Sequence, residues 1–118
     1  MKDDIQKFIE TITGKNLSIF IDGEGFDLSY DCINCHVYLS SNKINLRSGE
    51  ISENLTHNEF QIYIPSIESI QFNSKIEVTE DENEDYSLKI ITKDIAKICL
   101  EGEIEITICE YEIIKENK

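Results

Sequence analysis

The spacing of apolar residues changes once along the chain, at Gly14. Before this glycine, the apolar residues from Ile5 to Ile12 recur at the spacing of one helical face. Gly14 can adopt the left-handed conformation that often ends a helix. The pattern predicts a short amphipathic helix over residues 3–14, which packs its apolar face against the rest of the chain.

From residue 15 onward, apolar residues alternate with polar ones, which is the period of half-buried strands. Turn-forming residues separate the strands at short intervals, and no second helix is expected between them, so antiparallel pairing is favoured. We therefore predict a mainly β single domain over residues 1–118. The helix precedes an antiparallel β-barrel or β-sandwich of about eight short strands over residues 15–115, with a loop at residues 50–58.

Two places in the second half of the chain interrupt this alternation. The polar residues 92–94 are expected to separate two strands. In the last strand, the apolar residues from Ile104 to Ile108 lie on one face, whereas Ile113 has the opposite parity. Because a shift of one residue moves every side chain to the other face, we expect a β-bulge near residues 109–110.

Charge is the most informative part of the composition. The chain has 24 Asp and Glu against 11 Lys and Arg, a formal net charge of −13, while its 40% hydrophobic content still favours a folded core. Residues 22–31, 77–85 and 101–112 contain carboxylates and neither Lys nor Arg. We therefore expect no direct binding to nucleic acid, and a basic protein partner such as a nucleic-acid-binding enzyme or a toxin.

Twelve of the fifteen carboxylates in these three stretches are the candidate partner-binding residues. They are Asp22, Glu24, Asp27, Asp31, Glu77, Glu80, Asp81, Glu82, Glu84, Asp85, Glu103 and Glu105. Alternate acids on one strand stand about 6.8 Å apart, whereas duplex DNA carries one charge per roughly 1.7 Å of its axis. Mimicry of nucleic acid therefore needs several acidic strands on one side. Scattered acids would instead serve solubility and protect strand edges from aggregation.

The pattern Cys32-Ile-Asn-Cys35-His36 supports an alternative function, a small metal- or ligand-binding barrel. It matches a haem attachment signature, but that chemistry belongs to exported proteins and no signal-peptide pattern opens the chain. For zinc, Cys99 or Cys109 could complete the set, although their spacing does not repeat the first pair. Reduced thiols in the core are the favoured interpretation, and no cofactor is expected.

Enzyme chemistry has little support in the sequence. Only His36 and His57 could act as bases near neutral pH, and no Gly-rich phosphate loop is present. No apolar run is long enough to span a bilayer, so we expect a cytoplasmic protein without membrane contact. The favoured function is a non-enzymatic acidic protein that occludes a basic surface, as an inhibitor, an immunity protein or a phage anti-defence protein does.

The start of the chain resembles a known family of acidic proteins. A short amphipathic helix is followed by the residues Thr13-Gly-Lys-Asn-Leu-Ser-Ile19, and this combination is similar to the start of the phage uracil-DNA glycosylase inhibitors. Those inhibitors are DNA mimics, so the resemblance implies an inhibitor that imitates nucleic acid. It covers about the first twenty residues and ends before that family's enzyme-binding segment, so it implies no particular target.

Overall fold

The computed structural model describes residues 2–49 and 59–118, and the loop predicted at residues 50–58 lies outside this part of the chain. The elements are α1 (Lys2–Ile12), β1 (Leu17–Gly23), β2 (Phe26–Cys32), β3 (Cys35–Leu39), β4 (Lys43–Ser48), β5 (Glu59–Tyr63), the 3₁₀ turn η1 (Ile64–Ser66), β6 (Ile67–Phe72), β7 (Ile76–Glu82), β8 (Tyr86–Leu100) and β9 (Ile104–Asn117). The predicted N-terminal helix and mainly β character are confirmed.

The helix α1 supplies part of the core. Phe8 and Ile12 are fully buried, as the apolar stripe in the sequence predicts. Asp3 and Asp4 lie in the first turn, where negative charge favours the positive end of the helix dipole. Gly14 follows with a φ of +79°, the left-handed conformation expected at a helix end.

The strands form two antiparallel sheets. The larger sheet has the order β2-β1-β9-β8-β6, and β7 pairs with the same edge of β8 that β6 uses further along. The smaller sheet has the order β3-β4-β5. No closed barrel is found among the described strands, and the choice between the barrel and the sandwich stays a prediction.

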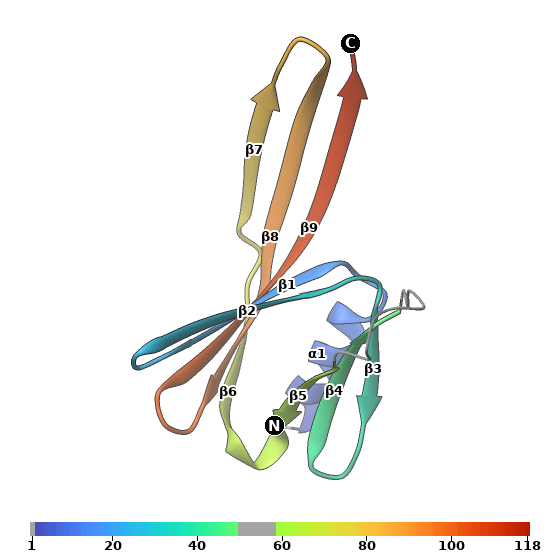
Figure 1. Ribbon diagram of the computed structural model, residues 1–118. Helices are drawn as coiled ribbons and strands as arrows, with labels where there is room; N and C mark the ends of the chain where they lie inside the picture. The colour runs from blue at the N-terminus through green and yellow to red at the C-terminus, as the bar shows by residue number, and fades with distance from the viewer. Residues whose placement is uncertain (1, 50–58) are drawn as a thin grey trace.

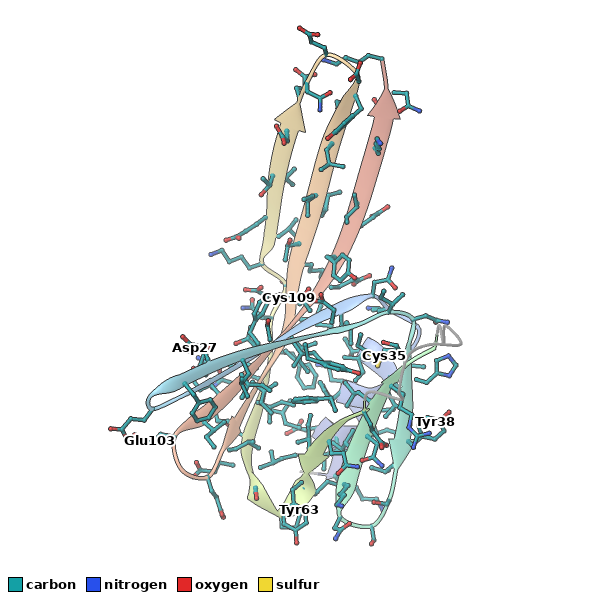
Figure 2. The ribbon with its side chains drawn as sticks, viewed as in Figure 1. Asp27, Cys35, Tyr38, Tyr63, Glu103 and Cys109 are labelled. Carbon is teal, nitrogen blue, oxygen red and sulfur yellow. The ribbon has the colours of Figure 1, made fainter. Side chains whose placement is uncertain are left out.

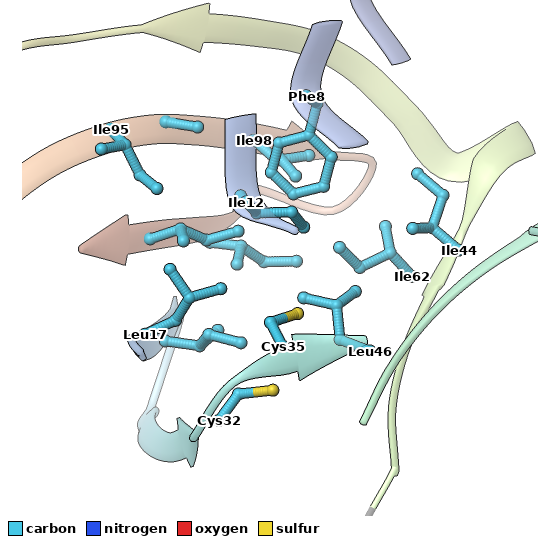
Figure 3. Packing of buried hydrophobic residues seen from close by; sticks show 14 of the residues in the cluster. Phe8, Ile12, Leu17, Cys32, Cys35, Ile44, Leu46, Ile62, Ile95 and Ile98 are labelled. Carbon is cyan, nitrogen blue, oxygen red and sulfur yellow. The ribbon is translucent and has the colours of Figure 1, made fainter. Parts of the chain in front are cut away.

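The core lies between the larger sheet, α1 and the smaller sheet. Figure 3 shows Phe8 of α1 beside Ile98 of β8, with Ile62 of the smaller sheet close by. Its buried apolar residues are Phe8, Ile12, Leu17, Ile19, Cys32, Cys35, Ile44, Leu46, Ile62, Ile70, Ile95, Ala96, Ile98, Ile106 and Ile108. Burial of these side chains from three separate layers holds the helix and both sheets together.

Two expectations about the last strands are wrong. Residues 92–94 do not separate two strands, because they pair with β9 inside the continuous 15-residue strand β8. The expected bulge in β9 is absent: the register shift does fall at Cys109, but the extra residue belongs to the partner strand β8, between Asp94 and Ala96. The extra residue, Ile95, is buried together with Ala96, so the bulge places two successive apolar side chains in the core.

One end of the larger sheet extends beyond the core as an arm, formed by β7 and the adjoining parts of β8 and β9 (residues 76–93 and 111–117). Figure 1 shows these three strands projecting away from the remainder, which we call the body. Every residue of β7 is exposed. The parity change in β9 occurs where the arm begins: Ile108 points into the core, whereas Ile113 belongs to the opposite face.

Replacement of Phe8 by alanine should destabilise the fold strongly. Its side chain is fully buried, so Phe8→Ala should lower the free energy of unfolding by about 3–5 kcal/mol in a urea titration. Phe20→Ala is the matched control, because Phe20 is 43% exposed and its removal should cost only about 0.5 kcal/mol. Equal losses for both variants would contradict this placement of the core.

Candidate acidic interaction site

The larger sheet of the body has one face that α1 does not cover, which we call the outer face. Along β1, Leu17 and Ile19 point into the core, so Phe20 and Asp22 point outward. Partners directly opposite in the register share a face. The outer face therefore contains Ser18, Phe20, Asp22, Asp27, Ser29, Asp31, Lys97, Glu105, Thr107 and Cys109.

Three carboxylates form a row across the outer face. Asp22 of β1 stands opposite Asp27 of β2 on one side and Glu105 of β9 on the other. Directly opposite residues have Cβ atoms about 5 Å apart, so this arrangement places like charges at close range. Two carboxylates that are far apart in the sequence, in the first and third acidic stretches, thus meet through the pairing of β1 with β9.

The row changes the protonation of its central member. The pKa of Asp22 is raised above its ordinary value of 3.8, first by a hydrogen bond with the Asp27 side chain, then by burial and by the charges of Asp27 and Glu105. Lys97 opposes this shift, and its Nζ lies 3.2 Å from Glu105 Oε2. One cation therefore serves a group of three carboxylates, which leaves the row negative and under internal repulsion at neutral pH.

An exposed aromatic side chain lies next to this row. Phe20 pairs with Ser29 and Thr107, and 43% of its surface is exposed on the outer face. Aromatic residues often anchor protein interfaces because they bury a large area at a low entropic cost. Phe20 is not among the candidate residues predicted from the sequence. The alternation of β1 nevertheless places it on the polar face of the strand, so its exposure could have been predicted.

The remaining acids of the first and third stretches lie near the same part of the sheet. Asp31 is on the outer face and accepts a hydrogen bond of 3.2 Å from Ser18 Oγ. Glu24 lies in the turn between β1 and β2, and Glu103 in the turn between β8 and β9. Figure 2 shows Asp27 and Glu103 in these two neighbouring hairpins. The candidate residues of the first and third stretches therefore share one region, whereas Glu112 of the third stretch lies in the arm.

The second acidic stretch is elsewhere. Its candidate residues, Glu77, Glu80, Asp81, Glu82, Glu84 and Asp85, lie on β7 and in the turn that leads to β8, which belongs to the arm. Figure 1 shows that turn at the far end of the arm, away from the β1–β2 and β8–β9 turns. The condition for nucleic-acid mimicry, that the acidic stretches lie on one side, is therefore not met by the second stretch.

The cysteine and histidine candidates do not converge. Cys32 and Cys35 are buried in the core, whereas His36 is exposed, because consecutive residues of β3 point to opposite faces. A hydrogen bond with Cys32 and burial raise the pKa of the Cys35 thiol, and the same bond lowers the pKa of Cys32. Within residues 2–49 and 59–118, no group of three His, Cys, Asp or Glu side chains could hold a metal ion.

Cys109 lies where the arm leaves the body, as Figure 2 shows. Its Sγ donates a hydrogen bond of 3.0 Å to Asp94 Oδ1. Burial, followed by the hydrogen bond and charge of Asp94, raises the pKa of Cys109 to about 12. Burial and the neighbouring carboxylate of Asp94 thus keep this thiol protonated.

Comparison of the chain with protein-family models, curated proteins and solved structures found no match. The similarity of the first twenty residues to the glycosylase inhibitors therefore remains a resemblance. Among the described residues, no helix is long and apolar enough to cross a membrane. The functional interpretation accordingly depends on the chemistry of the outer face and the arm.

Removal of the central carboxylate should stabilise the protein near neutral pH. Because the pKa of Asp22 is raised in the folded state, its ionisation costs stability as the pH rises from its ordinary value of 3.8 through the folded pKa. Asp22→Asn should therefore raise the melting temperature near neutral pH, and this gain should vanish below 3.8. Glu24→Gln removes the same charge from the neighbouring turn and serves as the control in pH-dependent thermal unfolding. Equal gains in both variants would indicate an effect of net charge alone.

Cys109 should resist alkylation in the folded protein. Since its pKa is raised to about 12, almost no thiolate forms at mildly alkaline pH, and its side chain is also buried. Treatment with iodoacetamide and peptide mass spectrometry should show Cys109 unmodified before denaturation and modified afterwards. Asp94→Asn removes the acceptor charge and should increase the labelling rate; rapid labelling of the unaltered protein would contradict the assignment.

Proposed function

We propose that this chain is a non-enzymatic acidic protein that binds and occludes a basic surface of another protein through its outer face. The observation that carries the proposal is the row of Asp22, Asp27 and Glu105 beside the exposed ring of Phe20. Two hairpins distant in sequence contribute to this row. The combination offers a partner both charge and an aromatic contact.

The internal repulsion of the row favours this function over simple solubility. In the free protein the pKa of Asp22 is raised by its hydrogen bond with Asp27 and by the charges of Asp27 and Glu105, so its neighbours disfavour the ionised form of Asp22. A Lys or Arg of a partner placed over these carboxylates would relieve that repulsion on binding. Part of the binding free energy would thus come from relief of the repulsion among these carboxylates. Separately, the net charge of −13 would speed the encounter with a cationic partner.

Spacing favours a basic protein surface over detailed imitation of duplex DNA. Neighbouring strands lie about 4.8 Å apart, so the charge row is denser than alternate acids along one strand. It is still much sparser than one charge per roughly 1.7 Å of duplex axis. The row can pair with a few partner cations without reproducing a phosphate backbone. Inhibitor, immunity or anti-defence roles, in a cytoplasmic setting, all fit such occlusion.

Capture experiments can test this function. The immobilised protein should retain a basic protein from an extract of its own organism or a competitor, and higher salt should speed dissociation. The triple variant Asp22→Asn, Asp27→Asn, Glu105→Gln should lower the affinity for that protein by about tenfold or more, and Phe20→Ala should also weaken it.

A control variant separates this contact from net charge. Asp3→Asn, Glu10→Gln and Glu68→Gln remove three exposed charges from α1 and β6, and they should leave the affinity nearly unchanged. If both triple variants weaken binding equally, or if no basic protein is retained at any salt concentration, the proposed use of the outer face is wrong.

A further inference from the structure

The outer edge of β7 has no partner strand. β7 pairs with β8 on one side, and nothing in the described part of the chain pairs with its other side. Two hydrogen bonds at the ends of the β7–β8 pair show which main-chain groups of β7 point towards β8. Asn83 N–H donates to the Tyr86 carbonyl (3.0 Å), and Asp94 N–H donates to the Lys75 carbonyl (2.9 Å). Odd-numbered residues of β7 therefore bond to β8, and the main-chain groups of even-numbered residues from Ile76 to Glu82 face outward.

Apolar side chains accompany these free main-chain groups. Ile76 is 60% exposed and Val78 is 52% exposed, and both lie on the same face of the arm. Val78 stands opposite Ile91 of β8, so the apolar surface continues from the edge onto the next strand. An open edge that combines unpaired backbone groups with exposed apolar side chains is a site where a further strand can add.

A hollow on the arm lies next to the acidic half of this edge. Its volume is about 280 Å³, and it is lined by Glu80, Asp81, Glu82, Ser87, Leu88, Lys89, Ile114 and Glu116. This is below the usual size of a pocket for a drug-sized ligand, but it has room for a single long side chain. Its four carboxylates outnumber its one lysine, Lys89, which stands opposite Glu80 on β8. Glu82 pairs with Lys118 at 3.6 Å, whereas in the described part of the chain no ion pair joins Glu80 or Asp81 to a cation. The hollow is therefore suited to a Lys or Arg side chain.

Charge decides which strand can occupy the edge. A second copy paired antiparallel about a two-fold axis at Thr79 would set Glu77 of each copy against Asp81 of the other, and the two Glu80 side chains would be diagonal neighbours across the pair. Like charges opposite one another destabilise a strand pair, so the acids oppose self-association. The same acids attract a strand that carries Lys or Arg at the facing positions.

We propose that the β7 edge binds an extended basic segment of a protein partner as an additional antiparallel strand. Apolar residues of that segment cover Ile76 and Val78, its cationic residues face Glu80 and Glu82, and one cationic side chain enters the hollow. The inference rests on the proposed function in that the partner is basic. It concerns a different surface, so the two can fail separately.

A synthetic peptide as long as β7, 7 residues, tests this inference on the full chain. From its N-terminus the peptide reads Lys-Lys-Lys-Thr-Val-Thr-Val, which sets lysines opposite Glu82, Asp81 and Glu80 and valines opposite Val78 and Ile76. Titration followed by NMR should show binding, with the amides of Ile76, Val78 and Glu80 protected from hydrogen exchange. N-methylation of the third and fifth peptide residues, whose amides face β7, should abolish binding. N-methylation of the second and fourth, whose amides face away, should not.

Protein variants separate strand addition from general attraction. Val78→Pro removes an outward N–H without removing a β7–β8 hydrogen bond and should weaken peptide binding about tenfold or more. Glu80→Gln tests the hollow without changing the backbone and should also weaken binding. Asp27→Asn, an equal charge change on the outer face, should have no effect. The inference is wrong if the peptide does not bind, if both N-methylated peptides bind equally, or if Asp27→Asn weakens binding as much as Glu80→Gln does.

Discussion

The continuous pairing of β8 with β9 is the constraint on which the rest of the structure depends. It runs from Leu100 opposite Ile104 at the turn to Tyr86 opposite Asn117 at the tip of the arm. The half near the turn receives β1 and β6 on its two sides and forms the body, whereas the far half receives only β7. The bulge at Ile95 lies between these halves. One ladder thus supports both a core and a projecting arm.

The same ladder determines where charge accumulates. Because β9 pairs with β1 as well as β8, Glu105 stands beside Asp22, and through β1 the row extends to Asp27. Asp94 occupies the junction on the same strand pair, where it accepts the hydrogen bond of Cys109. Without the long β9 strand, the first and third acidic stretches would be unrelated turns at separate ends of the chain.

The spacing of apolar residues along the sequence predicted the helix and the alternating strands, because the periods of both structures repeat within a few residues. It failed at residues 92–94, where polar side chains suggested a break between strands. Thr92 and Lys93 lie in the arm and Asp94 at its junction with the body, and all three residues are partly exposed, so their polarity does not prevent pairing with β9. The meeting of Asp22 with Glu105 could not be predicted, since it requires knowing that β1 pairs with β9. The separation of Cys35 from His36 was predictable, because adjacent strand residues point to opposite faces.

Repulsion between carboxylates has different consequences on the β7 edge and on the outer face. On β7 the acids lie along an open edge, where repulsion between copies protects the fold from aggregation and costs little within one molecule. On the outer face, Asp22 lies between Asp27 and Glu105, and the repulsion acts inside a single molecule. Solubility requires charge but no particular arrangement, so the same net charge could be dispersed without this cost. Solubility alone therefore does not account for the place of Asp22 between two carboxylates, and this arrangement is the reason why we propose a cationic partner for the outer face.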